Sequence, residues 1–324
     1  ILYFSFSFIM IEVQNLTKIY GKTAAIEDVS FRVEKGEILG LLGPNGAGKT
    51  TTMRILTGHT PPTSGYAFVA GFDVMKDSMA VRRCIGYLPE TVGVYEDMTV
   101  RAYLSFMAEV KGVKSAGRQR RVNDMMELTG IASCAERLIR NLSKGYRQRI
   151  GFAQALIAEP EVLILDEPTV GLDPAQIREI RSLIKAMEGK KTMILSTHIL
   201  PEAEALCQRI AIINLGRIAA VGTPAELAHR MSPAGRISLT ARGDSSAIKA
   251  ALEKPAGVLK ISERKMPIPD SGHSYYIDVQ KGAEIRGEII KALIASGCEL
   301  IEIATVSASL EDVYMEVVMG NRDA

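Results

Sequence analysis

Cysteine is scarce in this chain, with four residues among 324. No two of them form a C-x-x-C pair; they lie far apart, at Cys84, Cys134, Cys207 and Cys298. A disulfide framework or a zinc site needs closely spaced cysteines, so neither kind of protein fits this sequence. We therefore expect reduced, mostly buried thiols, as in a cytoplasmic protein.

Long apolar runs and a strong excess of one charge are also lacking. A membrane-spanning helix needs about 20 consecutive apolar residues, and the most apolar stretch, at residues 1–11, is about half that long. The formal net charge is only +2. The cluster of Arg118, Arg120 and Arg121 is better explained as a solvated helix face than as a nucleic-acid footprint. We expect no nucleic-acid partner.

The first residues do not resemble a signal peptide, because they lack a basic segment and a cleavage site. Met10 is followed at once by the strand-like sequence IEVQNL. We therefore interpret residues 1–9 as an extension outside the fold. A membrane-contacting anchor is the alternative function for these residues.

The sequence does contain a phosphate-binding loop. Residues 43–50 read GPNGAGKT, the spacing G-x-x-x-x-G-K-T, after an apolar strand and before a segment that can form a helix. Glycines let successive N–H groups point at an anion, and the helix N-terminus adds its positive dipole end. Lys49 is expected to reach the β- and γ-phosphates, and the Thr50 hydroxyl to contact Mg²⁺. The loop predicts binding of a nucleoside triphosphate.

Strands and helices alternate around this loop up to about residue 228, which predicts an α/β fold with a mainly parallel sheet. Apolar residues at helical spacing from Thr99 to Leu142 predict an inserted helical segment. The sequences at Ile11–Leu16 and Ala24–Val33 alternate as in antiparallel strands. Ser, Pro and Gly at Met231–Arg236 predict a linker, and beyond it the order β-α-β-β-α-β predicts a ferredoxin-like unit.

Two further segments carry chemistry. The run VLILDE ends a predicted strand with Asp166 and Glu167, where a P-loop ATPase has a Mg²⁺ ligand and a carboxylate that can polarise water. Ser143 and Gly145 precede a predicted helix and could hold a γ-phosphate. Ser143 taken alone is explained as well by ordinary helix capping.

Together these motifs resemble the nucleotide-binding subunit of an ATP-binding cassette (ABC) transporter. GPNGAGKTT is similar to its Walker A motif, LSKGYRQR to its signature, LILDEPTVGLD to its Walker B and D-loop, and STH to its switch histidine. The C-terminal sequence SLEDVYMEVV is similar to that of ABC-2 type exporters, which move drugs, lipids, polysaccharides or gliding components. The resemblance covers residues 11 to about 228.

The resemblance implies roles for particular residues. Lys49, Glu167 and His198 would be catalytic, and Asp173 of the D-loop would link two sites. Mg²⁺ would be held by Thr50, Asp166 and Glu90. The signature residues that act on the nucleotide of a second copy would be Ser143, Lys144, Gly145 and Tyr146. The nucleotide-binding residues would be Tyr20, Gly43, Pro44, Asn45, Gly46, Ala47, Gly48, Lys49, Thr50 and Thr51.

This chain departs from the common pattern at three of these positions. Lys144 and Tyr146 stand where many families have Gly and Gln, and Glu90 stands where a Gln is common. A carboxylate can still approach Mg²⁺ or water, and ABC-2 subunits are similar at these places. The substitutions therefore favour this branch of the family, but they leave the coupling role of Glu90 open.

The predicted fold is a P-loop cassette at residues 10–230, with an antiparallel β subdomain and a helical insertion at about 97–155, and a small α+β ferredoxin-like domain at 236–324. The resemblance implies an ATPase that uses ATP and Mg²⁺, dimerises head-to-tail and binds membrane permease subunits at the cytoplasmic face of the membrane. The alternatives are a soluble cassette ATPase acting on ribosomes or DNA, and a small-molecule kinase. The kinase leaves LSKGYRQR and His198 unexplained.

Overall fold

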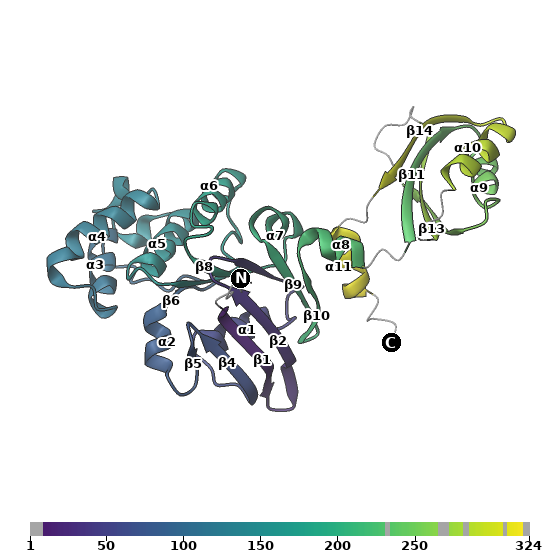
Figure 1. Ribbon diagram of the computed structural model, residues 1–324. Coiled ribbons are helices and arrows are strands. Elements are labelled where there is room, and N and C mark those ends of the chain that lie inside the picture. Colours follow the sequence, from purple (N-terminus) through teal and green to yellow (C-terminus); the bar gives the residue numbers. More distant parts are fainter. Residues whose placement is uncertain (1–8, 231–233, 265–271, 281–284, 307–309, 320–324) are drawn as a thin grey trace, which may run out of the picture. The chain divides into compact units, whose positions relative to one another are not determined.

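The computed structural model describes residues 9–230, 234–264, 272–280, 285–306 and 310–319 (Figure 1). The chain divides into two compact units between Pro224 and Ala225, a few residues before the linker that the sequence predicts. Most of the predicted N-terminal extension lies outside the described residues, but Ile9 belongs to a strand and pairs with Glu34. Assigning Ile9 to the extension was therefore wrong.

The first unit is built on a six-stranded sheet with the strand order β10-β9-β3-β8-β7-β6. Every residue of β3 (Ile38–Leu42), β7 (Val162–Asp166) and β8 (Thr192–Thr197) is buried, as expected for parallel strands covered on both faces. Parallel strands align their carboxyl ends, so the residues that follow these three strands meet at one edge. The remaining strands are β6 (Ile85–Leu88), β9 (Arg209–Asn214) and β10 (Arg217–Gly222), the last paired antiparallel to β9.

A second, antiparallel sheet of order β2-β1-β4-β5 belongs to the same unit. Its long pair, β1 (Ile9–Tyr20) and β2 (Thr23–Glu34), is extended by the shorter β4 (Ser64–Val69) and β5 (Phe72–Asp73). In β2 the side chains alternate between buried and exposed from Val29 onwards, which is the pattern of a sheet with one face on the core.

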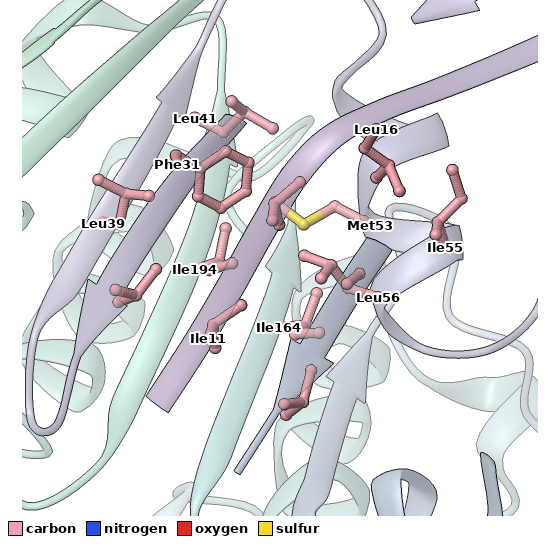
Figure 2. Close-up of a cluster of buried hydrophobic side chains, with 14 of the residues drawn as sticks. Ile11, Leu16, Phe31, Leu39, Leu41, Met53, Ile55, Leu56, Ile164 and Ile194 are labelled. Atoms are coloured by element: carbon pink, nitrogen blue, oxygen red, sulfur yellow. The ribbon is translucent and has the colours of Figure 1, made fainter. Parts of the chain in front are cut away.

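The main hydrophobic core lies between the two sheets and around α1 (Lys49–Leu56) (Figure 2). Each fully buried Leu, Ile or Met side chain in it stabilises the fold by about 1.5–3 kcal/mol. Its members come from both sheets and from α1, and they include Ile11, Leu16, Phe31, Leu39, Met53, Leu56, Ile164 and Ile194. This packing fixes β3 and α1, the two elements between which the phosphate loop runs.

The other helices of the first unit follow the predicted order. The helical insertion contains α3 (Val100–Val110) and α4 (Ser115–Leu128), two short 3-10 turns, and then α5 (Lys144–Leu156). Thr99 caps α3 by accepting a hydrogen bond from the Ala102 N–H at 3.3 Å. The remaining helices are α2 (Ser78–Cys84), α6 (Pro174–Lys185), α7 (Leu200–Leu206) and α8 (Pro224–Arg230), which reaches past the division of the units.

The second unit has an antiparallel sheet of order β12-β13-β11-β14, which is the strand order of a ferredoxin-like fold. Helices α9 (Ser245–Leu252) and α10 (Arg286–Ala295) contribute Ile248, Leu252, Ile289 and Leu293 to its core. Its strands are β11 (Ala234–Arg242), β12 (Val258–Arg264), β13 (His273–Gln280) and β14 (Glu299–Val306), and α11 (Leu310–Met319) follows them.

The linker that the sequence predicts at Met231–Arg236 lies partly within a strand. The residues Ala234–Arg236, predicted as linker, instead begin β11 and pair with β13. The other linker residues, 231–233, lie outside the described part of the chain. Across the described residues, no helix is both long enough and apolar enough to cross a membrane.

Candidate active site

The phosphate loop connects the end of β3 to α1, and two of its glycines are required by close contacts. Gly48 precedes α1 with a φ of 107°, and a Cβ there would lie 2.5 Å from Ile26 Cγ2. A Cβ on Gly43 would overlap the carbonyl oxygen of Ile213. No side chain caps α1, so the N–H groups at its start are available to an anion.

Lys49 is the cation of this loop, and its ammonium group is held on three sides. Its Nζ donates hydrogen bonds to the carbonyl oxygens of Gly43 at 2.7 Å and Pro44 at 3.2 Å. The third partner is Glu167, whose Oε1 lies 3.1 Å from Nζ, and both side chains are 6% exposed. Buried charges need such partners. The ammonium group is thus aimed at the loop where phosphates would lie.

Asp166 ends β7 beside the phosphate loop. Its Oδ1 accepts hydrogen bonds from Ser196 Oγ at 2.6 Å and from Thr50 Oγ1 at 3.3 Å. Burial raises the pKa of the Asp166 carboxyl, and the hydrogen bonds from Ser196 and Thr50 partly oppose this effect. Its Oδ2 is buried and accepts no hydrogen bond from the described residues.

These residues fit a Mg²⁺ ion. A buried carboxylate oxygen without a donor, next to a hydroxyl, is the oxygen chemistry that this hard cation prefers. The described residues contain no group of three or more His, Cys, Asp or Glu side chains that could hold a metal ion on their own. Mg²⁺ commonly binds through one or two protein ligands together with phosphates. Thr50 and Asp166 would hold the ion here, and Glu90, the third predicted ligand, lines the same cavity as Thr50.

Glu167 follows β7 in an unusual backbone conformation. Its φ of 50° lies in the left-handed region, which is strained for a residue with a side chain. Its N–H donates a hydrogen bond to Ser196 Oγ at 2.9 Å, and its Oε2 lies 2.9 Å from His198 Nδ1. The carboxylate therefore lies between Lys49 and His198. A carboxylate in this place can orient and polarise a water molecule.

A cavity of about 310 Å³ brings most of the predicted residues together. A volume near 300 Å³ is at the lower end of the usual range for small-molecule sites. Tyr20, the expected adenine-stacking residue, is not among the lining residues, although it lies 47% exposed at the end of β1. The residues of the described part of the chain that line the cavity are Ala25, Asn45, Gly46, Gly48, Lys49, Thr50, Thr51, Glu90, Glu167, Val170 and His198.

The four predicted signature residues lie at the start of α5, and none of them lines this cavity. Ser143 is exposed and caps α5, accepting a long hydrogen bond from the Tyr146 N–H at 3.5 Å. Lys144 is exposed and its Nζ lies against Gly171. Within one chain, Ser143 therefore acts as the N-terminal cap of α5.

Gly145 and Asp173 connect this segment to α6. Gly145 is buried, and a Cβ there would overlap the side-chain amide of Gln176. Asp173 caps α6 by accepting hydrogen bonds from the N–H groups of Ala175 at 3.0 Å and Gln176 at 2.9 Å. Within one chain, the signature segment at the start of α5 therefore contacts α6, the helix that follows the D-loop, through Gly145 and Gln176.

The structure also adds residues that the sequence analysis missed. Ser196 binds both Asp166 and the Glu167 N–H, because β7 and β8 pair in parallel with Asp166 opposite Ser196. Gln148 donates from Nε2 to the Pro168 carbonyl at 3.0 Å and so ties α5 to the turn after Glu167. The position of Ser196 two residues before His198, in a predicted strand, was the available sequence signal.

Comparison with known proteins agrees with this geometry. Residues 26–170 match the ABC transporter family. The chain is 34% identical over 260 residues to the linearmycin resistance ATP-binding protein LnrL of Bacillus subtilis, covering 80% of this chain and 84% of that protein. It is 35% identical over 308 residues to the doxorubicin resistance ATP-binding protein DrrA of Mycobacterium tuberculosis, covering 94% and 92%.

A solved structure described as the ATP binding subunit of an ABC transporter is also similar. It superposes with a TM-score of 0.64 at 32% identity, over 68% of this chain and 92% of that one. The matched length corresponds to a single cassette.

Proposed function

Because this chain belongs to the ABC transporter family, we propose that it is the ATP-hydrolysing subunit of an ABC-2 type membrane exporter. ABC cassettes of this family bind nucleotide and are ATPases. The observation that carries the proposal is the meeting of four side chains, from the start of α1 and from the ends of β7 and β8: Lys49, Asp166, Glu167 and His198. These are the groups that phosphoryl transfer to water needs in one place.

Each of these side chains has a separate task. Lys49 exchanges the carboxylate of Glu167 for the phosphates of ATP, since both partners are anionic and the ammonium is already directed at the loop. Mg²⁺, held by Thr50 and Asp166, would neutralise part of the charge that develops on the phosphates. Glu167, released from Lys49, orients and polarises the attacking water, and His198 contacts the γ-phosphate.

Two copies of the chain form the complete site. Ser143 and Gly145 lie outside the cavity of their own chain, and Ser143 is exposed, so its hydroxyl and the start of α5 can reach a phosphate bound to a second copy. A head-to-tail pair of this kind has two equivalent sites. ATP then holds the two copies together, and hydrolysis releases them.

The partners are membrane permease subunits, and the chain lies peripherally at the cytoplasmic face of the membrane. The relatives named for linearmycin and doxorubicin resistance support an exporter of drug-like compounds. The position of Glu90, which lines both the nucleotide cavity and a neighbouring cavity with Lys144 and Arg147, suits a residue that transmits the state of the site. A soluble cassette acting on ribosomes or DNA is not supported by the relatives named above.

The experiment compares the purified parent chain with Glu167→Gln and a control, Glu204→Gln, which changes an exposed glutamate. We expect Mg²⁺-dependent ATP hydrolysis in the parent and the control. Glu167→Gln should bind ATP, hydrolyse it at least about tenfold more slowly, and accumulate as a dimer in size-exclusion chromatography. A Glu167→Gln chain that stays monomeric with ATP and hydrolyses normally contradicts the proposal. Co-purification of the native chain with membrane proteins tests the permease partner.

A further inference from the structure

One helix next to the active-site segments buries a carboxylate that is outside the catalytic set. Glu202, in α7, is 0% exposed. Its Oε1 accepts a hydrogen bond from Thr169 Oγ1 at 2.7 Å, and its Oε2 accepts one from Thr197 Oγ1 at 2.6 Å. The Arg181 Nε atom lies 4.0 Å from Oε1. Burying a carboxylate is costly unless its oxygens are hydrogen-bonded, so the two threonines account for how this side chain is tolerated.

The two threonines belong to different loops of the active site. Thr197 ends β8 directly before His198, and its Oγ1 also accepts a hydrogen bond from the Ile199 N–H at 3.0 Å. The backbone on both sides of His198 is thus fixed through Thr197, which Glu202 holds in place.

Thr169 lies in the loop that leads from Glu167 to Asp173. Its carbonyl oxygen accepts from the Leu172 N–H at 3.2 Å, and the Val170 N–H donates to the Glu167 carbonyl at 3.2 Å. These bonds make a compact turn. A group that holds the Thr169 hydroxyl therefore holds the backbone on which Glu167 lies.

We propose that Glu202 is a positioning residue that joins the His198 turn to the Glu167 loop. The two loops carry the pair His198 Nδ1 and Glu167 Oε2, which are 2.9 Å apart. The His198 side chain is 40% exposed, so packing alone does not fix it. A carboxylate can accept from both hydroxyls at once, one on each oxygen, whereas an amide has a single accepting oxygen. This inference rests on the proposed ATP hydrolysis.

The test uses steady-state ATP hydrolysis by the full chain, with kcat calculated per nucleotide-binding chain. Misplacing a catalytic group by about 1 Å can lower a rate by about a hundredfold. We expect Glu202→Ala to lower kcat by about thirtyfold and Glu202→Gln by about threefold, with KM for ATP changed less than about twofold, because the phosphate loop is untouched. Glu204→Gln, an exposed glutamate of the same helix, should match the parent.

Isosteric removal of the hydroxyls gives an independent readout. Thr197→Val and Thr169→Val should each lower kcat in the parent, but either change should add little in the Glu202→Ala background, because its partner is already gone. If Glu202→Ala does not fold, the two valine variants and Glu202→Gln test the positioning role of Glu202.

The outcomes separate this inference from the proposed function. A parent chain that hydrolyses no ATP overturns the proposed function and this role with it. An active parent whose Glu202→Gln, Thr169→Val and Thr197→Val variants all keep the parent kcat overturns the positioning role alone. A loss that is fully explained by a smaller nucleotide-binding fraction also overturns it, since that is the result of a merely structural role.

Discussion

Replacing Lys49 with alanine is expected to destabilise the chain itself, in addition to weakening nucleotide binding. The Lys49 and Glu167 side chains form an ion pair at 3.1 Å and are each 6% exposed. Removing one partner of a buried ion pair costs about 3–5 kcal/mol, because the other charge is left uncompensated. His198 remains 2.9 Å from Glu167 and offers one contact, so we expect the lower end, about 3 kcal/mol.

A second substitution tests the origin of this loss. In the Lys49→Ala background, Glu167→Gln removes the uncompensated charge, so it should restore about half of the lost free energy of unfolding. Lys185→Ala is the control, because the ion pair of Lys185 with Glu188 is exposed, with 51% of the lysine side chain accessible. An exposed pair contributes about 0–1 kcal/mol. The control should therefore unfold almost like the parent.

Thermal and chemical denaturation without nucleotide, followed by circular dichroism, measures these differences. For a unit of about 150–250 residues, 1 kcal/mol shifts Tm by about 2–4 °C, so Lys49→Ala should melt about 6–12 °C below the parent. The reasoning is refuted if Lys49→Ala melts like Lys185→Ala. It is also refuted if the effects of Lys49→Ala and Glu167→Gln simply add, because the two charges would then not stabilise one another.

Three further predictions concern the surroundings of the site. Glu90→Gln should retain most ATPase activity, whereas Glu90→Ala should abolish the stimulation of ATPase activity by membrane subunits, measured with and without those subunits; full stimulation of Glu90→Ala contradicts this. Gly145→Ala should lower ATP hydrolysis by about twofold at most, because the Gln176 amide that its Cβ would overlap ends a flexible side chain and can move aside, and adding Gln176→Ala should remove that loss; a loss of about tenfold or more that Gln176→Ala leaves unchanged contradicts this. Deleting residues 232–324 should leave a folded chain that binds ATP, since the main core and the motifs lie before residue 232. A truncated chain that is insoluble or does not bind ATP would show that the boundary between the two domains is misplaced.

The sequence was sufficient to predict those features of the structure that depend on residues close together in the chain. The phosphate loop needs glycines at fixed positions between a strand and a helix, and Gly43 and Gly48 are required by contacts that the structure shows directly. The α/β cassette and the ferredoxin-like strand order were also predicted correctly, because apolar runs and turn residues mark these elements.

Contacts between distant parts of the chain were less accessible. Ser196 lies beside Asp166 only because β7 and β8 are neighbours in register, and the sequence does not state which strands pair. Glu202 looks like an ordinary helical glutamate until the turns that carry Thr169 and Thr197 are folded around it. The Ile9 assignment failed for a similar reason, since its place in β1 depends on pairing with Glu34.

The central claim is that ATP is hydrolysed at a site shared between two copies of this chain. The most direct measurement mixes two variants, each of which is expected to be inactive alone. One carries Lys49→Ala with Glu167→Gln, which disables its own nucleotide cavity but leaves its Ser143 intact. The other carries Ser143→Arg, which blocks an exposed signature but leaves its Lys49 and Glu167 intact.

A mixed head-to-tail dimer of these variants contains one site built from two intact halves. Random pairing in an equimolar mixture gives about half mixed dimers, so about a quarter of the parent number of sites should be complete. The account predicts Mg²⁺-dependent ATP hydrolysis in the mixture well above that of either variant alone, up to about a quarter of the parent rate. A mixture that hydrolyses ATP no faster than the average of its two separate components would contradict it.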